Sequence, residues 1–430
     1  MFDPSSIRAF RAVSWRFDEA TGVATFEYAL AADAHEWTFT EQVSFAPAVL
    51  TPPRRAVVDR LLKHLFVACG ISYFKAAAPP VVRIEQGCFT DAEIAFHCLV
   101  IEKGLGEYCF HNEIELLHPR FDFQPALSAP EPIRGLGLDR GPLIPVGGGK
   151  DSCVTVEAWR SDAPTLITVN RYPVIQDVID ASALPDLLVR RTIDPRLFEL
   201  NGVGALNGHV PITSIVSLCV LVAAVIRGHG QVVMSNERSA SEGNVVYRGA
   251  EINHQWSKSA EFEAGLQSVL AAITPEVTWS SYLRPWSELA IVDRFVRTGA
   301  RYLDVFSSCN AAFRLDPTRR TTRWCGTCPK CQFVFLALAT ALDRAAVERI
   351  FGADLFTTSP VKGFEALLGL ADWKPFECVG ESGECRVALR IVAEREDWSS
   401  HPVVVALAGA VRARHFWPSV EEVEAIYAPA

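Results

Sequence analysis

The stretch Val146-Gly-Gly-Gly-Lys-Asp-Ser-Cys153 is a glycine-rich turn between an apolar segment, Leu143 to Val146, and a segment of helical character, Ser152 to Trp159. Consecutive glycines let the backbone approach an anion closely because no Cβ stands in the way. The first N–H groups of the following helix have no intrahelical partners and point toward such a ligand. The stretch therefore predicts a phosphate-binding loop between a strand and a helix.

Two side chains of this loop suit a nucleotide with its metal ion. A carboxylate beside a phosphate is repulsive unless Mg²⁺ lies between them, so Asp151 is a candidate magnesium ligand and Ser152 a candidate phosphate donor. The spacing differs from the Walker pattern, which disfavours a kinase or a GTPase. A tight strand-to-helix turn without a ligand is the alternative that the glycines alone leave open.

Composition limits the class of protein. The chain has 430 residues, enough for two or three domains, and its net charge of -9 argues against broad nucleic-acid binding. Residues 1–11 lack the apolar core of a signal peptide, and the apolar stretch 211–226 is shorter than the roughly 20 residues of a membrane span. We therefore expect a cytoplasmic protein with no nucleic-acid or membrane partner and with free or metal-bound cysteines. The sequence does not indicate the oligomeric state.

The chain divides by pattern into three regions. Residues 1–135 alternate β-type segments and two helices, which predicts an N-terminal α+β domain, and a proline-rich linker follows from Pro119 to Pro142. Residues 140–340 alternate strands and helices, which predicts a parallel sheet with helices on both faces, and residues 341–430 are mainly helical in pattern. Ligands of such sheets bind at the carboxyl ends of the strands, so the loops after Val146, Asn170 and Met234 should meet at one pocket.

The periodicity also places individual elements. Strands are predicted at 9–17, 23–30, 37–45, 143–146, 165–170 and 231–234, and helices at 54–67, 90–103, 211–227, 333–342, 345–351 and 403–415.

A second group of polar residues follows the predicted strand 231–234, from Ser235 to Glu263. A loop at that end of a strand would face the ligand, whereas a solvated loop is the alternative. His254 and Lys258 lie four residues apart, which puts them on one face if the segment is helical, and both can carry a proton. Glu237 and Arg238 are either site residues or a plain ion pair.

Four cysteines have the spacing of a metal site. Cys325, Cys328 and Cys331 are separated by two residues each, and Cys309 lies a short loop upstream. Four thiolates in this arrangement predict a structural zinc site, with an iron–sulfur cluster as the alternative. The neighbouring Arg319, Arg320, Arg323 and Lys330 form a basic cluster that is either a solvated face or an anion site.

These motifs carry a family resemblance. The loop at 147–152 resembles the PP-loop of the ATP pyrophosphatase superfamily, Ser-Gly-Gly-x-Asp-Ser, with Gly147 in place of the first serine. Together with Ser235-Asn-Glu-Arg-Ser-Ala240, Asn253-His-Gln-Trp-Ser-Lys-Ser259 and Trp324-Cys-Gly-Thr-Cys-Pro-Lys-Cys331, it is similar to the MurL family of UDP-N-acetylmuramoyl-L-alanyl-L-glutamate epimerases. The pairing of a PP-loop with four cysteines also resembles QueC, the 7-cyano-7-deazaguanine synthase.

The MurL resemblance implies an α/β fold of the PP-loop (HUP-like) type and inversion of the terminal L-glutamate of UDP-MurNAc-L-Ala-L-Glu, with ATP converted to AMP and pyrophosphate. Adenylation cancels the carboxylate charge, which makes the α-proton easier to remove. The implied ligands of ATP are Gly147, Gly148, Gly149, Lys150, Asp151, Ser152, Asn236 and Arg238. The implied metals are Mg²⁺ on Asp151 and zinc on Cys309, Cys325, Cys328 and Cys331.

Inversion needs a proton removed from one face of the α-carbon and delivered to the other. His254 and Lys258 are the first candidates, and Glu237, Cys153 and Cys309 follow. The QueC resemblance implies instead an amide- or nitrile-forming ligase that acts on a carboxylated deazaguanine. A tRNA thiolase is disfavoured by the acidic charge, and a zinc protein that binds ATP without turnover is the non-catalytic alternative.

Overall fold

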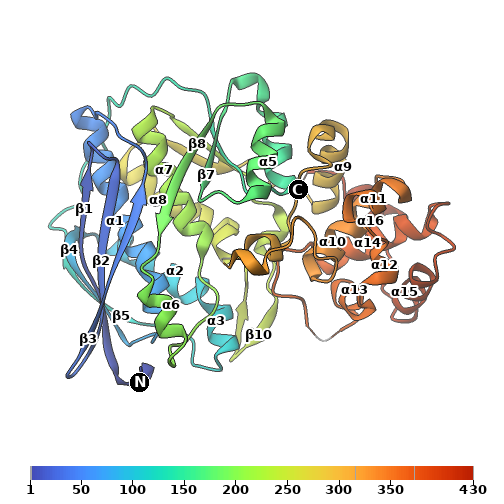
Figure 1. The fold of residues 1–430 in the computed structure, drawn as a ribbon, viewed down its shortest axis with the longest axis horizontal. Coiled ribbons are helices and arrows are strands. Elements are labelled where there is room, and N and C mark those ends of the chain that lie inside the picture. The colour runs from blue at the N-terminus through green and yellow to red at the C-terminus, as the bar shows by residue number, and fades with distance from the viewer. Residues whose placement is uncertain (1, 315, 372, 430) are drawn as a thin grey trace.

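A ten-stranded mixed sheet forms the centre of the computed structural model, which describes residues 2–314, 316–371 and 373–429 (Figure 1). Its strand order is β12-β9-β6-β7-β8-β3-β2-β1-β4-β5. The strands are β1 (Ile7–Asp18), β2 (Val23–Ala32), β3 (Glu36–Ser44), β4 (Val81–Phe89), β5 (Arg120–Pro125), β6 (Leu143–Pro145), β7 (Thr165–Val169), β8 (Asp186–Thr192), β9 (Gln231–Met234) and β12 (Thr278–Ser281). A separate hairpin is made of β10 (Val245–Tyr247) and β11 (Ala250–Ile252).

Helices cover this sheet and make up the C-terminal part of the chain (Figure 1). They are α1 (Pro52–Phe74), α2 (Asp91–Gly104), α3 (Gly106–His111), α4 (Lys150–Ala158), α5 (Pro173–Ser182), α6 (Arg196–Asn201), α7 (Ile212–Arg227), α8 (Ala260–Ile273), α9 (Glu288–Thr298), α10 (Pro329–Leu338), α11 (Arg344–Phe351), α12 (Leu355–Thr358), α13 (Val361–Leu367), α14 (Ser382–Glu394), α15 (Pro402–Ala413) and α16 (Val420–Ala425). None of the helices in these described ranges is both long and apolar enough to cross a lipid bilayer.

The N-terminal strands β1, β2 and β3 lie where the sequence predicts strands, and they form an antiparallel meander against α1. Aromatic side chains fill the layer between them, and the rings of Tyr28 and Tyr73 stack with centroids 5.0 Å apart. Helix α2 begins as predicted, because Thr90 and Glu93 form a reciprocal capping box. The predicted linker 119–142 is only partly a linker, since β5 lies within it and pairs with β4.

The N-terminal meander continues into the parallel part of the sheet, because β3 pairs antiparallel with β8. The predicted border between residues 135 and 140 therefore does not separate two sheets. A buried ion pair spans this junction: Arg191 on β8 donates to Glu41 on β3 at 2.7 Å and to the hydroxyl of Ser72 on α1 at 2.8 Å. Strand β8 was not predicted, because Arg190 and Arg191 interrupt the apolar pattern of this half-buried strand.

Loss of this ion pair should destabilise the protein. Replacing Glu41 by alanine leaves the Arg191 guanidinium buried without its counter-ion, which typically costs about 3–5 kcal/mol. We expect the urea midpoint of unfolding to fall accordingly. The matched control is Asp33→Ala, which removes the exposed Arg8–Asp33 pair and should cost about 0–1 kcal/mol. Equal midpoints for the two variants would contradict the role assigned to the junction.

The parallel strands carry helices on both faces, as predicted. Ile167 and Val232 belong to the hydrophobic core that includes α7 and α8, whereas their neighbours Leu166 and Val233 belong to the core that includes α4 and α9. Alternate residues of one strand point to opposite faces, so this division shows a sheet buried on both sides. The second core extends into the C-terminal helices, which lie at the opposite end of the molecule from β1 and β2 (Figure 1).

Candidate functional site

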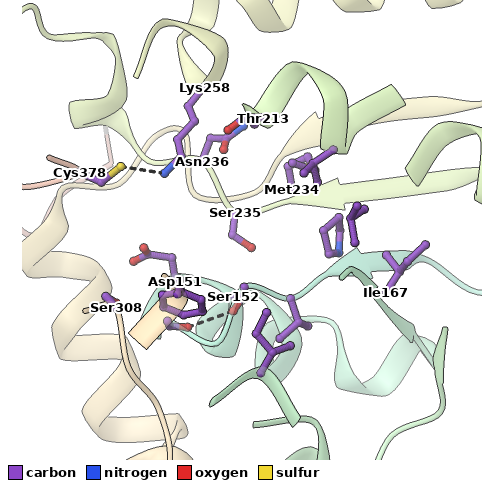
Figure 2. Close-up of a pocket in the computed structure, with 18 of the residues that line it drawn as sticks. Asp151, Ser152, Ile167, Thr213, Met234, Ser235, Asn236, Lys258, Ser308 and Cys378 are labelled. Carbon is purple, nitrogen blue, oxygen red and sulfur yellow. Dashed lines mark hydrogen bonds between the residues drawn. The ribbon is translucent and has the colours of Figure 1, made fainter. Parts of the chain in front are cut away.

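A cavity of about 340 Å³ lies at the carboxyl ends of β6, β7 and β9 (Figure 2). Residues at or after the ends of these three strands line it, namely Val146, Val169 and Ser235. This is the position at which ligands bind in open α/β sheets. The predicted meeting of the strand ends is therefore confirmed. The rest of the wall includes residues of α7, residues of the segment 307–313, and Lys258, Lys330 and Cys378.

Residues of the glycine loop, 147–152, line one side of the cavity, and the last three residues of the loop form the first turn of α4. Gly148 has φ +83°, a left-handed conformation that favours glycine. A Cβ on Gly149 would lie 2.7 Å from the hydroxyl of Ser308, so this position must also remain small. Gly147, Gly149, Asp151 and Ser152 line the cavity, and the Ser152 hydroxyl donates to the carbonyl of Gly149 at 3.0 Å. The open N-terminus of α4 thus faces a space that can hold an anion.

Lys150 does not belong to the described cavity lining. Its ammonium group is buried and donates to the carboxylates of Asp151 and Glu288. The pKa of Asp151 is raised by burial, but the charges of Lys150 and Lys330 outweigh this and lower it below its usual value. Asp151 is therefore an anion, as a magnesium ligand must be. The lysines that line the cavity are Lys258 and Lys330 instead of Lys150.

The loop after β9 contributes fewer residues than the sequence suggests. Asn236 lines the cavity and donates to the hydroxyl of Ser281 at 3.0 Å. The hydroxyl of Ser235 points into the cavity and has no hydrogen-bond partner among the described residues, which leaves it available to a ligand (Figure 2). Glu237 is buried behind the wall, and Arg238 is bound to the carboxylate of Glu384 at 3.2 Å. The described cavity lining includes neither Glu237 nor Arg238.

His254 and Lys258 do not share an α-helical face. Residues 256–258 form a short 3₁₀ turn, and α8 begins only after Ser259, whose hydroxyl accepts from the N–H of Phe262. The two side chains nevertheless converge on Cys378. Lys258 lines the cavity and its ammonium lies 3.4 Å from the sulfur, while the charge of His254 acts on the same sulfur from behind the wall.

Cys378 is the site residue that the sequence did not reveal. It lies in the loop before α14 and lines the cavity opposite the glycine loop (Figure 2). Burial raises the pKa of its thiol, but the charge of Lys258 and the hydrogen bond from His254 outweigh burial and lower the pKa to about 6. The group is therefore mostly a thiolate at neutral pH. No motif surrounds it, and its partners Lys258 and His254 come from a distant segment of the chain.

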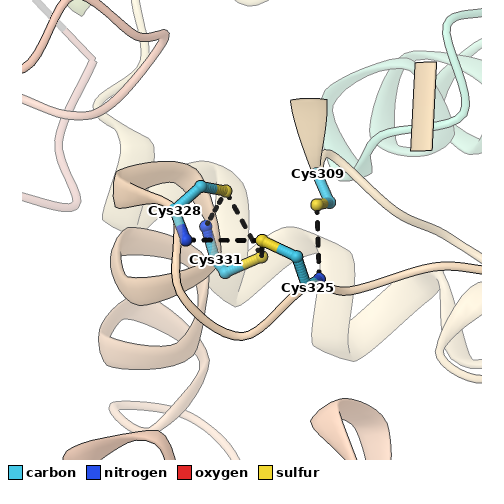
Figure 3. Close-up of side chains that lie close together, drawn as sticks. All are labelled: Cys309, Cys325, Cys328 and Cys331. Carbon is cyan, nitrogen blue, oxygen red and sulfur yellow. Dashed lines mark hydrogen bonds between the residues drawn. The ribbon is translucent and has the colours of Figure 1, made fainter. Parts of the chain in front are cut away.

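The four predicted metal ligands lie together beside this cavity (Figure 3). Cys331 Sγ lies 3.5 Å from Cys328 Sγ and 3.7 Å from Cys325 Sγ, and all four sulfurs lie within 4.8 Å of one another. A tetrahedral zinc ion with Zn–S bonds of about 2.3 Å requires sulfurs about 3.8 Å apart. The sulfurs of Cys309, Cys325 and Cys328 also accept backbone N–H groups at 3.4 Å, as thiolates do. The donor set thus fits zinc.

The cysteine cluster is connected to the cavity through α10. Cys328 caps this helix, and Lys330 in its first turn donates to the backbone carbonyl of Cys378. The backbone N–H of Lys330 donates to Glu377 at 2.8 Å. Lys330 is the member of the predicted basic cluster found in the described cavity lining, whereas the guanidinium of Arg320 lies over the ring of Tyr172.

The two cysteines named as further acid/base candidates occupy other places. Cys309 belongs to the cluster of four, and Cys153 is buried in α4, where burial raises the pKa of its thiol. The described cavity lining contains neither of them.

Comparison with known proteins gives matches over nearly the whole chain. A family model of the MurL N-terminal domain matches residues 1–281, and one of the MurL C-terminal domain matches residues 305–421. A protein of Salinispora tropica is 44% identical over 415 residues, covering 94% of this chain and 89% of its own length. A protein of Xanthomonas oryzae pv. oryzae is 40% identical over 407 residues, covering 94% and 90%. Both are named UDP-N-acetyl-alpha-D-muramoyl-L-alanyl-L-glutamate epimerase. No solved structure gives a significant match.

Proposed function

Because the chain belongs to the MurL family, we propose that it inverts the terminal L-glutamate of UDP-N-acetyl-α-D-muramoyl-L-alanyl-L-glutamate to D-glutamate in the synthesis of peptidoglycan precursors. The main observation in support of this proposal is that a single cavity has two chemically different sides. An anion-binding glycine loop with Asp151 lies on one side, and the Lys258–Cys378 pair lies on the other. None of the matches reported above supports the alternative of a deazaguanine ligase.

The glycine loop is proposed to act as a PP-loop that binds ATP. Its backbone N–H groups and the Ser152 hydroxyl would hold the phosphates, and Asp151 would hold Mg²⁺. An oxygen of the substrate carboxylate then attacks the α-phosphorus, and pyrophosphate leaves. Lys330 and Lys258 line the same space and can offset the charge of the phosphates. Lys150 contributes through its ion pair with Glu288, which fixes the start of α4.

Activation of the carboxylate makes removal of the α-proton easier. Removal of the α-proton beside a free carboxylate would place a second negative charge next to the first, whereas an acyl adenylate can accept the charge on its carbonyl oxygen. Burial lowers the pKa of the Lys258 ammonium, but the neighbouring charges of Cys378 and Glu237 outweigh burial and raise it above its usual value. Lys258 is therefore protonated and can stabilise the developing oxyanion.

The cysteine cluster is proposed to hold a structural zinc ion. Four thiolates leave no open coordination position, so the ion would fix α10 and, through Lys330, the wall that carries Cys378. Its role would be structural and distinct from the chemistry at the α-carbon. A cytoplasmic location stays a prediction, in keeping with a nucleotide-linked substrate.

The test is pyrophosphate release from ATP and Mg²⁺ with UDP-MurNAc-L-Ala-L-Glu, followed by hydrolysis of the product and chiral analysis of the glutamate. We expect pyrophosphate and D-glutamate to appear together. UDP-MurNAc-L-Ala, which lacks the reacting residue, is the matched control and should give no pyrophosphate. Epimerisation without ATP would refute the adenylation step, and the absence of epimerisation with ATP present would refute the function.

A further inference from the structure

Cys378, His254 and Glu107 form a row of three interacting side chains that ends in the cavity: Glu107 is hydrogen-bonded to His254, and the charge of His254 acts on the sulfur of Cys378. The carboxylate of Glu107, on α3, lies 2.5 Å from Nδ1 of His254. Because Nδ1 is engaged in this way, the ring nitrogen available to the sulfur of Cys378 is Nε2. This is the order of groups found in acyl-transfer triads, in which a carboxylate orients an imidazole and the imidazole serves a nucleophile.

Only the sulfur end of this chain is in contact with the cavity. Cys378 lines it, whereas His254 and Glu107 are largely buried behind Cys378. The Lys258 ammonium, 3.4 Å from the sulfur, adds a second cation on the cavity side. A substrate carbonyl bound near the glycine loop would therefore meet the thiol group before it met the imidazole.

The surroundings of the sulfur suit a nucleophile better than a base. Burial lowers the pKa of His254, but the hydrogen bonds to Cys378 and Glu107 raise it to about 9, so the imidazole is a cation at neutral pH. A thiolate between two cations is present at neutral pH and leaves readily from a thioester. The same surroundings make it a weaker base for an α-proton.

We propose that Cys378 is a catalytic nucleophile that receives the activated acyl group as a thioester. The inference rests on the proposed function, which supplies the acyl adenylate. The thiolate sulfur attacks the carbonyl carbon of the adenylate, the C–S bond forms, the C–O bond to the phosphate breaks, and AMP leaves. After inversion at the α-carbon, water attacks the carbonyl carbon of the thioester and the C–S bond breaks. The thiolate is restored, and the carboxylate and two protons are released.

The thioester would also assist inversion. A thioester carbonyl withdraws electrons from the α-carbon more strongly than a carboxylate does, and the Lys258 ammonium lies next to the sulfur that carries it. Departure of AMP before inversion would free space in the cavity for movement of the glutamyl group. His254 and Glu107 are positioning residues in this scheme, since they act through Cys378.

The first experiment traps the intermediate. Wild-type protein is mixed with ATP, Mg²⁺ and UDP-MurNAc-L-Ala-L-Glu, quenched with acid within one turnover, and measured by intact mass spectrometry. We expect added mass equal to the substrate less one water, located on Cys378 and removed by neutral hydroxylamine. Cys378→Ala should show no such mass and should epimerise at least about 10³-fold more slowly. Cys98→Ala, a change on α2 outside the cavity, should behave as wild type.

The variant also separates adenylation from acyl transfer. Cys378→Ala should still release one equivalent of pyrophosphate but should retain AMP as the acyl adenylate, which also shows that the variant is folded. Epimerisation by Cys378→Ala at the wild-type rate would overturn the proposal. Loss of epimerisation in this variant with no adduct in the wild type would overturn it as well, because that result assigns the sulfur to proton transfer.

Alkylation by iodoacetamide tests the triad without any substrate. At pH 7 Cys378 should react at least about 10-fold faster than Cys98, and His254→Gln should move the midpoint of its rate profile to higher pH. The other charged or titratable groups near His254 or the sulfur are Glu107, His209, Lys258, Lys330 and Glu377. Equal rates at Cys378 and Cys98 would overturn the proposal, whereas fast alkylation without pyrophosphate release would refute the proposed function alone.

Discussion

Replacement of Asp151 by asparagine should lower the rate of pyrophosphate release by about 100-fold or more, because the metal ion would lose its anionic protein ligand. Asp151 lines the cavity at the first turn of α4, and the charges of Lys150 and Lys330 keep its pKa below the usual value despite burial. An asparagine has the same shape but no charge, so Mg²⁺ bridging to the phosphates would weaken. Titration of activity with Mg²⁺ at saturating ATP should show a raised requirement for the metal.

The fold should tolerate this change. Lys150 keeps its second partner, Glu288, so the buried ammonium is not left without a counter-ion. Asp162→Asn is the matched control, since Asp162 is an exposed residue in the turn after α4. A wild-type Mg²⁺ dependence of Asp151→Asn would show that the metal is held elsewhere and would remove this residue from the ATP site.

The part of the site that follows from local sequence was predictable. The glycine loop, the strand before it and the helix after it are adjacent in the chain, and their conformations depend on residues within a few positions of one another. The four cysteines were equally visible, because metal-ligand spacing is a local pattern and Cys309 lies a short loop upstream. Their convergence, and the position of the cavity at the strand ends, follow from general rules of α/β folds.

The side chains that depend on distant partners were not predictable in the same way. The orientation of Lys150 is decided by Glu288, which lies 138 residues further along the chain. The placement of β8 depends on the pairing of Arg191 with Glu41 across 150 residues. Cys378 becomes a site residue only because Lys258, 120 residues earlier, is folded against it. Without an alignment, one sequence contains no signal that links such pairs.

The prediction for His254 and Lys258 shows both what local sequence can indicate and what it cannot. The two residues were grouped for a helical spacing that the chain does not adopt, although both act on Cys378. The 3₁₀ turn brings them to the same sulfur from different sides. Their roles as acid and base therefore stay a prediction, and the structure adds a third group between them that local spacing could not indicate.

Loss of the metal from the cysteine cluster should have the largest effect on stability. Four sulfurs within 4.8 Å of one another would repel as thiolates in the absence of a cation. Binding of structural zinc contributes on the order of 10 kcal/mol, which is comparable with the whole stability of a typical domain. Cys331→Ser should therefore abolish zinc binding and unfold the helices from α10 onward, and atomic emission and urea denaturation measure the two effects.

The matched control for this change is Cys88→Ser, because Cys88 is an exposed cysteine outside the cluster. It should leave zinc content and the unfolding midpoint unchanged. Activity should fall together with zinc, since the link from Lys330 to the carbonyl of Cys378 makes the cavity wall depend on α10. Wild-type protein without zinc, or a Cys331→Ser variant with wild-type stability, would show that the sulfurs are held by packing alone and that the cavity wall stands without the metal.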